Sequence, residues 1–266
     1  MKDTPFQNRV KQLLRQGKKT AGAWVQTGSP VAAEIMAAAG FVLIMLDLEH
    51  APGDNMTLVH ICQALGGTGA VPMVRSTWND FVQIKRILDA GAYGVLVPYV
   101  NTREEAEAAV SACKYPPEGI RGVAGSPRAA GYGRNKGDYL GRANDELLIL
   151  TAVETAAAVE NLDKILTVSG LDGIFIGPMD LASSLGHFGD PGHSEVQAVI
   201  RKIEKKVVAT GKVLSSLCST WETAGAMYES GYNMLMLMAD GIVLSQLSSE
   251  KIDQFRNCLL YTSDAA

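Results

Sequence analysis

Short runs of apolar residues alternate along this chain with longer segments in which apolar positions recur with a helical period. The apolar runs are rich in Val, Ile, Leu and Met and are almost uninterrupted, which is typical of parallel strands buried on both faces. They predict eight strands, at residues 20–25, 41–48, 70–75, 94–100, 147–153, 173–176, 213–218 and 233–238.

The segments between these runs carry the start and stop signals of helices. Thr102 and Glu105 have the spacing of a capping box, and several of the periodic segments are followed by a glycine, the residue preferred after a helix end. The periodicity predicts helices at residues 30–39, 80–90, 102–114, 159–168, 195–210, 223–230 and 242–255.

This alternation predicts an α/β fold, a (β/α)8 TIM barrel that forms a single domain over residues 1–256. A doubly wound open sheet is the alternative. It would ordinarily carry a phosphate loop, but neither G-x-G-x-x-G nor a Walker sequence follows the first predicted strand. Residues 257–266 add neither helix pattern nor core, and we expect a disordered or non-native tail there. The long irregular stretch 115–144 is expected to be functional or to lie at a subunit contact.

Composition narrows the functional classes. The chain has 266 residues, 47% of them hydrophobic, which argues against intrinsic disorder. Its 24 basic residues are outnumbered by 28 acidic ones, and this balance provides neither a basic surface for nucleic acid nor a polybasic membrane anchor. The 27 glycines indicate many tight connections.

The cysteines and the first residues indicate where the protein works. The four cysteines lie far apart and form no C-x-x-C pair, which is typical of a reducing compartment. The N-terminus has no apolar segment of a signal peptide, and the longest apolar run, 41–46, is far too short to span a bilayer. We therefore expect a cytoplasmic protein without membrane segments.

Candidate chemistry lies where the predicted strands end, because the active sites of such barrels are built at the carboxyl ends of the strands. Glu154 and Asp180 follow neighbouring strands and could share one hard divalent cation. Arg75 would lie near the negative charge that develops on a keto oxygen, and His50 would serve as a base. The other polar residues at these ends are Asp47 and Glu49, expected to support the site from behind, and Asp240.

Each of these residues also has a plain structural interpretation. A lone carboxylate at a strand end often caps the next helix, His50 could be an ordinary loop histidine, and Arg75 could be an ion-pair partner. His60 falls within a helical segment, and the spacing of His187 and His193 is not that of a zinc site, so all three are expected to be structural. The predicted strands carry no interior lysine, which disfavours Schiff-base chemistry.

Several segments, taken in order, resemble the HpcH/HpaI aldolase family over about residues 5–255. Members of this family are metal-dependent (class II) pyruvate aldolases that act on 2-keto-3-deoxy sugar acids and 4-hydroxy-2-oxoheptanedioate. The segments are DLEHAP at 47–52, IKRILDAGA at 84–92, YPPEGIRGV at 115–123, ET at 154–155 and GIFIGPMDL at 173–181.

The resemblance implies a role for each matching residue. Glu154 and Asp180 match the carboxylates that hold one Mg²⁺, Mn²⁺ or Co²⁺ ion. His50 matches a histidine that acts as acid and base through water. Asp89 matches an aspartate that reaches in from a neighbouring subunit and raises the basicity of that histidine. Arg75 matches the residue that stabilises the pyruvate enolate held at the metal.

The resemblance also implies a substrate class and an assembly. The backbone at Gly177, Met179 and Asp180 matches the part that cradles the pyruvyl carboxylate. The implied partners are a keto acid, pyruvate or hydroxypyruvate, and an aldehyde, which are joined or released at a 4-hydroxy-2-keto acid. Family members usually form hexamers, trimers of dimers, and exchange the last helix between subunits.

The chain departs from the family pattern at four positions. Ala152 stands where Gln is common, Ser76 where Pro or Val follows the arginine, Met179 where Ala or Ser is usual, and Met238 where relatives have Gly. None of these changes removes a metal ligand or the base, but they reshape the pocket, so the family pattern does not define the substrate. The rival hypotheses are a CoA-ester lyase of the citramalyl or malyl type and a catalytically silent barrel.

Overall fold

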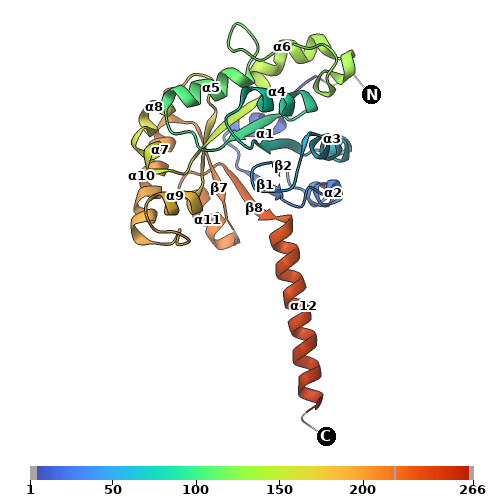
Figure 1. The fold of residues 1–266 in the computed structure, drawn as a ribbon, viewed down its shortest axis with the longest axis vertical. Helices are drawn as coiled ribbons and strands as arrows, with labels where there is room; N and C mark the ends of the chain where they lie inside the picture. The colour runs from blue at the N-terminus through green and yellow to red at the C-terminus, as the bar shows by residue number, and fades with distance from the viewer. Residues whose placement is uncertain (1–4, 219, 264–266) are drawn as a thin grey trace.

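Eight parallel strands close into one barrel in chain order, with β8 pairing back onto β1 (Figure 1). The computed structural model describes residues 5–218 and 220–263. The predicted single TIM barrel is confirmed, and the open-sheet alternative is wrong. The strands are β1 Thr20–Val25, β2 Leu43–Asp47, β3 Val71–Arg75, β4 Gly94–Val97, β5 Leu148–Val153, β6 Gly173–Ile176, β7 Val213–Leu217 and β8 Met234–Ala239.

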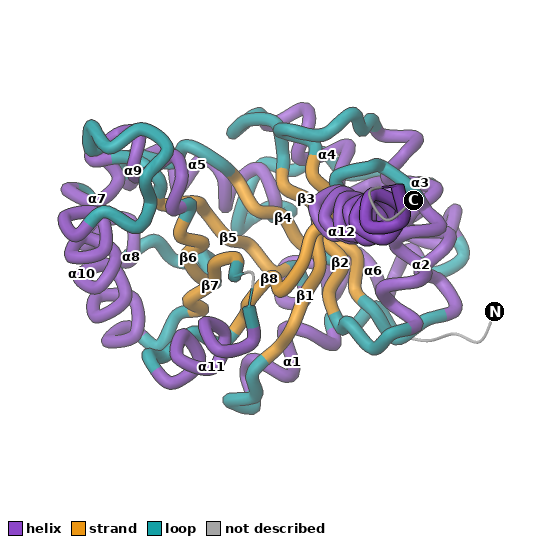
Figure 2. The backbone as a smooth tube through the Cα atoms, turned by 90° about the horizontal axis from the view of Figure 1, so that it is seen from below, coloured by secondary structure: helices purple, strands orange, loops and turns teal. Residues whose placement is uncertain are grey.

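Helices surround the strands (Figure 2). The predicted stops at Gly91 and Gly211 are confirmed, because both glycines follow a helix end with φ of 111° and 70°. The helices are α1 Arg9–Arg15, α2 Pro30–Ala38, α3 Asn55–Ala64, α4 Phe81–Ala90, α5 Arg103–Cys113, α6 Lys136–Glu146, α7 Ala156–Glu160, α8 Leu162–Leu166, α9 Pro178–Ser184, α10 Ser194–Thr210, α11 Trp221–Glu229 and α12 Asp240–Ser263, with 3₁₀ turns at Leu65–Gly67 and Arg128–Gly133.

Two apolar layers hold the barrel together. Along β2, Leu43 and Met45 belong to a cluster inside the barrel, while Ile44 and Leu46 belong to the larger cluster between strands and helices. Helix α1 packs Val10 against the inner cluster. Because α1 precedes β1, it lies beside the amino ends of the strands and leaves the carboxyl ends as the open face of the barrel.

Some elements differ from the sequence prediction. The helix expected at 159–168 is two short helices, α7 and α8, which meet at Asn161. Strand β4 ends at Val97 rather than at residue 100. The stretch 115–144 is less irregular than expected, since it contains a 3₁₀ turn and most of α6. The short helices α1 and α9 were not predicted, because neither is long enough to show a helical period.

The last helix, α12, projects away from the barrel (Figure 1). The expectation that it ends at Phe255 was wrong: the helix continues to Ser263 through part of the predicted tail. Residues 256–263 contain no Pro or Gly, so nothing stops a helix already nucleated upstream. Residues 264–266 lie outside the described residues, and a non-native origin of the tail stays a prediction. None of the described helices combines the length and apolar character needed to cross a membrane.

Candidate active site

Arg75 is the centre of an ion-pair network at the carboxyl ends of β2 and β3. Its Nε and Nη2 donate to the two carboxylate oxygens of Asp47 at 2.9 and 2.6 Å, and its Nη1 lies 3.1 Å from Oε2 of Glu49. The guanidinium carbon lies 4.7 Å from the centre of the Trp24 ring. A guanidinium fixed by a bidentate pair and a ring face keeps one orientation.

Asp47 ties this network to the loop that carries His50. The Asp47 side chain is fully buried, and its Oδ1 also accepts from the backbone N–H groups of Glu49 and His50, at 3.0 and 3.3 Å. Burial by itself raises the pKa of Asp47, but the bonds from Arg75 and the two N–H groups outweigh it and hold the pKa below its ordinary value. Asp47 is therefore an anion that fixes both Arg75 and the start of the loop.

Glu49 and Glu154 stand in the opposite electrostatic situation. Burial raises the pKa of each to about 7, and Asp180 adds to both rises, although Arg75 acts against them. Asp47 also raises the pKa of Glu49, and Glu49 raises that of Glu154. Glu154 is almost fully buried at the end of β5. The predicted metal ligands, Glu154 and Asp180, are thus close enough for one to raise the pKa of the other. The side chains around them do not neutralise their negative charge. A divalent cation fits this arrangement.

Tyr99 connects the two predicted metal ligands. Its backbone N–H donates to Oε1 of Glu154 at 2.7 Å, and its hydroxyl donates to Oδ1 of Asp180 at 3.3 Å. Its φ of 53° is unusual for a residue with a side chain, and its ring stacks on Trp78 with centroids 5.7 Å apart. The sequence prediction missed Tyr99 because it placed this residue inside a strand; Pro98, which ends the apolar run, was the available signal.

Gly177 makes room for Glu154 where β6 passes into α9. A Cβ atom built on Gly177 would lie only 2.5 Å from Oε2 of Glu154, so a larger residue would push the carboxylate aside. Pro178 then starts α9, which places Asp180 in its first turn. The side chain of Met179 is exposed.

His50 and Asp89 do not meet within one chain. His50 is exposed, and its Nε2 lies 3.7 Å from Oε2 of Glu49. Asp89 is near the end of α4, beside the amino end of the barrel, and it accepts from Nη2 of the buried Arg121 at 2.6 Å. The described chain thus brings Arg75, Glu154 and Asp180 together with His50 at the rim and leaves Asp89 apart.

Of the four departures from the family pattern, Met179 is exposed and the other three lie in different surroundings. Ala152 is buried in the inner apolar cluster, opposite Phe175 of β6 in the strand register. Met238 packs against the outer cluster, between strands and helices. The Ser76 hydroxyl is buried and donates to the backbone of Leu96. Ala152 is therefore the departure that changes the interior of the barrel.

Comparison with known proteins identifies the family of the chain. The profile of the HpcH/HpaI aldolase/citrate lyase family matches residues 20–246. The chain belongs to the HpcH/HpaI aldolase/citrate lyase family. It is 38% identical over 256 residues to the 5-keto-4-deoxy-D-glucarate aldolase of Escherichia coli, an alignment covering 96% of this chain and 100% of that protein.

Solved structures of the family have the same fold. An HpcH/HpaI aldolase/citrate lyase family protein from Burkholderia cenocepacia superposes with a TM-score of 0.89 at 33% identity, covering 94% of this chain and 99% of that one. An HpcH/HpaI aldolase from Desulfitobacterium hafniense gives 0.86 at 29% identity, covering 92% and 96%. The predicted family and enzyme class are confirmed: the chain is an aldolase-type carbon–carbon lyase.

Proposed function

We propose that this enzyme is a class II aldolase that cleaves or forms 4-hydroxy-2-keto acids with the help of one divalent metal ion held by Glu154 and Asp180. The observation that supports this best is the concentration of negative charge at the end of the barrel, where burial and like charge raise the pKa of Glu49 and Glu154 to about 7. A dication bound there would keep these carboxylates ionised. Their oxygen donors suit Mg²⁺, Mn²⁺ or Co²⁺.

When bound, the ion would act as a Lewis acid toward the keto group of the substrate. The backbone at Gly177, Met179 and Asp180 is the proposed seat of the substrate carboxylate. Arg75, held in place by Asp47 and Glu49, would face the keto oxygen as negative charge develops on it. A donor that is fixed before the reaction stabilises such charge without reorganising.

His50 is the proposed acid and base. In the cleavage direction it would accept the proton of the C4 hydroxyl through a water molecule while the C3–C4 bond breaks. In the direction of synthesis it would return that proton to the new hydroxyl. Its exposed place at the rim fits a group that reaches substrate through water. We propose that Asp89 of a neighbouring subunit completes this function, since Asp89 does not meet His50 within the chain.

The substrate we propose is a 5-keto-4-deoxy-hexarate, following the relative from Escherichia coli. When its carbons are numbered from the carboxyl group next to the keto group, such an acid is a 4-hydroxy-2-keto acid. Cleavage between C3 and C4 would release pyruvate and a three-carbon aldehyde acid. Hydroxypyruvate is a second keto acid that we expect the site to accept in the direction of synthesis.

The decisive experiment measures pyruvate release from 5-keto-4-deoxy-D-glucarate. We expect activity to disappear in EDTA and to return with Mn²⁺ or Co²⁺, and borohydride to have no effect. Activity that survives EDTA but is abolished by borohydride would overturn the proposal. His50→Ala is expected to lose turnover while metal binding remains, and His60→Ala is its control, because His60 lies on α3 away from the strand ends.

A CoA-ester lyase is the competing function, because the family name includes citrate lyase. In a cleavage assay with both substrates, a citramalyl or malyl thioester that outcompetes the free keto acid would favour the lyase. A chain that turns over neither, and is unaffected by His50→Ala, would be the silent barrel.

We further propose that α12 is exchanged between subunits in a hexamer built as a trimer of dimers. Its large apolar side chains are exposed in the single chain, among them Ile242, Leu244, Leu247 and Phe255. So much exposed apolar surface on one isolated helix calls for a partner surface. A solution mass of six chains that falls to a smaller species after truncation at Asp240 would support the exchange. A monomer at micromolar concentration would refute it. We place the enzyme in the cytoplasm, consistent with its free cysteines.

A further inference from the structure

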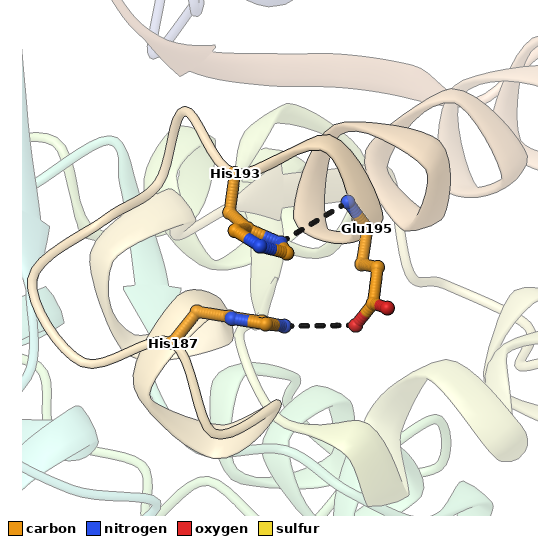
Figure 3. A group of neighbouring side chains, drawn as sticks. All are labelled: His187, His193 and Glu195. Carbon is orange, nitrogen blue, oxygen red and sulfur yellow. Dashed lines mark hydrogen bonds and ion pairs between the residues drawn. The ribbon is translucent and has the colours of Figure 1, made fainter.

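Two histidines and a glutamate meet on the surface between α9 and α10, away from the chemistry described above (Figure 3). Nε2 of His187 lies 2.9 Å from Oε2 of Glu195. The rings of His187 and His193 are stacked, with centroids 3.6 Å apart and planes 17° from parallel. One ligand atom from each of the three residues lies within 4.8 Å of the other two.

The backbone between these residues is ordered by its own hydrogen bonds. The His187 N–H donates to the carbonyl of Ala182 at 2.8 Å, the Asp190 N–H to the carbonyl of His187 at 3.0 Å, and the His193 N–H to the carbonyl of Asp190 at 3.2 Å. The loop is therefore a series of turns that brings two imidazoles together from positions six residues apart along the chain. This proximity could not be read from the spacing of the histidines.

We propose that His187, His193 and Glu195 form a second metal site that binds a borderline transition-metal ion, with Zn²⁺ as its preferred occupant. Two imidazoles and one carboxylate are a ligand set that Zn²⁺ accepts, with a fourth position left for water. Nitrogen donors favour Zn²⁺ strongly over Mg²⁺, whereas the Glu154 and Asp180 site offers only carboxylate oxygens. The chain thus carries two sites of different chemical preference.

Binding requires a small, defined rearrangement. Stacked rings direct their nitrogen lone pairs side by side, so one ring must turn before both nitrogens face the same ion. His193 is the one to turn, because its Nδ1 accepts only the long 3.3 Å bond from the N–H of Glu195. His187 and Glu195 already face one another. Loss of the stacking is therefore a marker of binding.

The position of the site suggests what a bound ion would do. His187 follows the end of α9, whose first turn carries Asp180, and Glu195 lies in the first turn of α10. An ion held by both segments would tie α9 to α10. A metal ion that binds only the folded chain also raises the thermal stability of the protein.

The test is a zinc titration of two matched proteins. The variant Glu154→Gln/Asp180→Asn removes the carboxylates of the first site, and we expect it to bind one Zn²⁺ per chain with millimolar Mg²⁺ present. Adding His187→Gln and His193→Gln to it should abolish this binding. His60→Gln is the control for loss of a surface histidine and should leave the stoichiometry unchanged. Circular dichroism verifies that each variant is folded.

A second measurement covers the case in which the carboxylate variant does not fold. In the wild-type chain we expect two Zn²⁺ per chain, reduced to one by His187→Gln/His193→Gln, with Mn²⁺-supported cleavage unchanged. The imidazole proton resonances of His187 and His193 should shift together on zinc addition as the stack opens. Equal zinc stoichiometry with and without the two histidines would overturn the proposal, whatever the outcome for the aldolase activity.

Discussion

The two ends of the barrel treat their charges in opposite ways. At the amino end, the Nζ of Lys11 lies 2.8 Å from Oδ1 of Asp172 and donates to the carbonyl of Leu147 at 2.6 Å, and Asp172 also accepts from the N–H of Ile149. At the carboxyl end, Arg75 forms ion pairs with Asp47 and Glu49. Glu154 and Asp180 lie nearby and accept hydrogen bonds from Tyr99.

This difference separates stability from function within one fold. The paired charges at the amino end stabilise the barrel, because Lys11 and Asp172 satisfy one another there. The carboxyl end keeps negative charge that its own side chains do not balance, which costs stability and creates the demand for a cation. Substitutions at the two ends should therefore have opposite signatures in activity and in unfolding.

The strongest test of the comparison is Glu154→Gln. We expect kcat/KM to fall by about 10³-fold or more, because the change removes a proposed metal ligand and with it several kcal/mol of transition-state stabilisation. The metal-free variant should be at least as stable as the wild type at pH 8, since a buried negative charge is gone. Pyruvate release and thermal unfolding measure the two effects. Glu160→Gln, on the exposed end of α7, is the control. An activity loss below tenfold would contradict the proposed role.

Arg75→Lys should affect both properties. A lysine cannot reproduce the bidentate bond to Asp47, so we expect a loss of about 10²-fold in kcat/KM and about 1–3 kcal/mol in the free energy of unfolding. Steady-state kinetics and urea unfolding give the two values. Arg103→Lys on exposed α5 should change neither. If Arg75→Lys lost stability alone, Arg75 would be a structural ion pair and not part of the chemistry.

The pH dependence of stability sharpens the contrast without metal. The folded pKa of Glu154 is raised to about 7 from 4.5, so between these values the folded state binds more protons than the unfolded state. Its contribution to stability therefore falls as pH rises from about 4.5 to 7 and stays low above that. We subtract the free energy of unfolding of Glu154→Gln from that of the wild type, both measured by urea unfolding in EDTA. This value should fall by up to about 3 kcal/mol between pH 4.5 and pH 8. A value that does not change with pH would show that the pKa of Glu154 is not raised in the folded state.

The amino end predicts the reverse signature. Lys11→Met removes the partner of the half-buried Asp172, so we expect a loss of about 1–3 kcal/mol in the free energy of unfolding with kcat and KM unchanged at 25 °C. Chemical denaturation and the pyruvate assay measure the two. Lys18→Met, at an exposed lysine after α1, should be silent in both. A change in KM on Lys11→Met would mean that the two ends are coupled.

The smallest expected effect is that of Tyr99→Phe. The hydroxyl lies 3.3 Å from Asp180, so its loss should weaken the orientation of that carboxylate by about 0.5–1.5 kcal/mol, or about 2–10-fold in metal affinity. The backbone N–H that serves Glu154 is unaffected by this change. Metal titration by calorimetry gives the value, and Tyr132→Phe on the exposed 3₁₀ turn is the matched control. If the metal affinity did not change, the Tyr99 hydroxyl would not help to orient Asp180, and only the backbone N–H of Tyr99 would contribute to the site.

Much of the fold and part of the site could be predicted from sequence. Parallel strands read as apolar runs, and their carboxyl ends meet by the geometry of a closed barrel. The proximity of Arg75, Glu154 and Asp180 therefore followed from position alone. Their roles, and those of His50 and Asp89, rest on the family resemblance and on the charge pattern, and remain proposals.

The remaining features depend on contacts that no local pattern encodes. The place of Tyr99 at the site comes from a left-handed backbone conformation just after β4. The pair of Asp89 with Arg121 joins residues 32 positions apart. The stacked His187 and His193 depend on a chain of turns. In each case the decisive information is tertiary, because the residue types involved are equally common in ordinary loops.

The closed hydrogen bonding between β1 and β8 has a consequence for how such enzymes diversify. Every described strand has a neighbour on both sides, so none of them offers a free edge to another protein molecule. Changes at the rim of the carboxyl end, such as the one at Met179, alter residues outside that ladder and leave its backbone pairing intact. New substrate preferences can then be sampled by mutation at little risk of aggregation, which gives the scaffold wide evolutionary latitude.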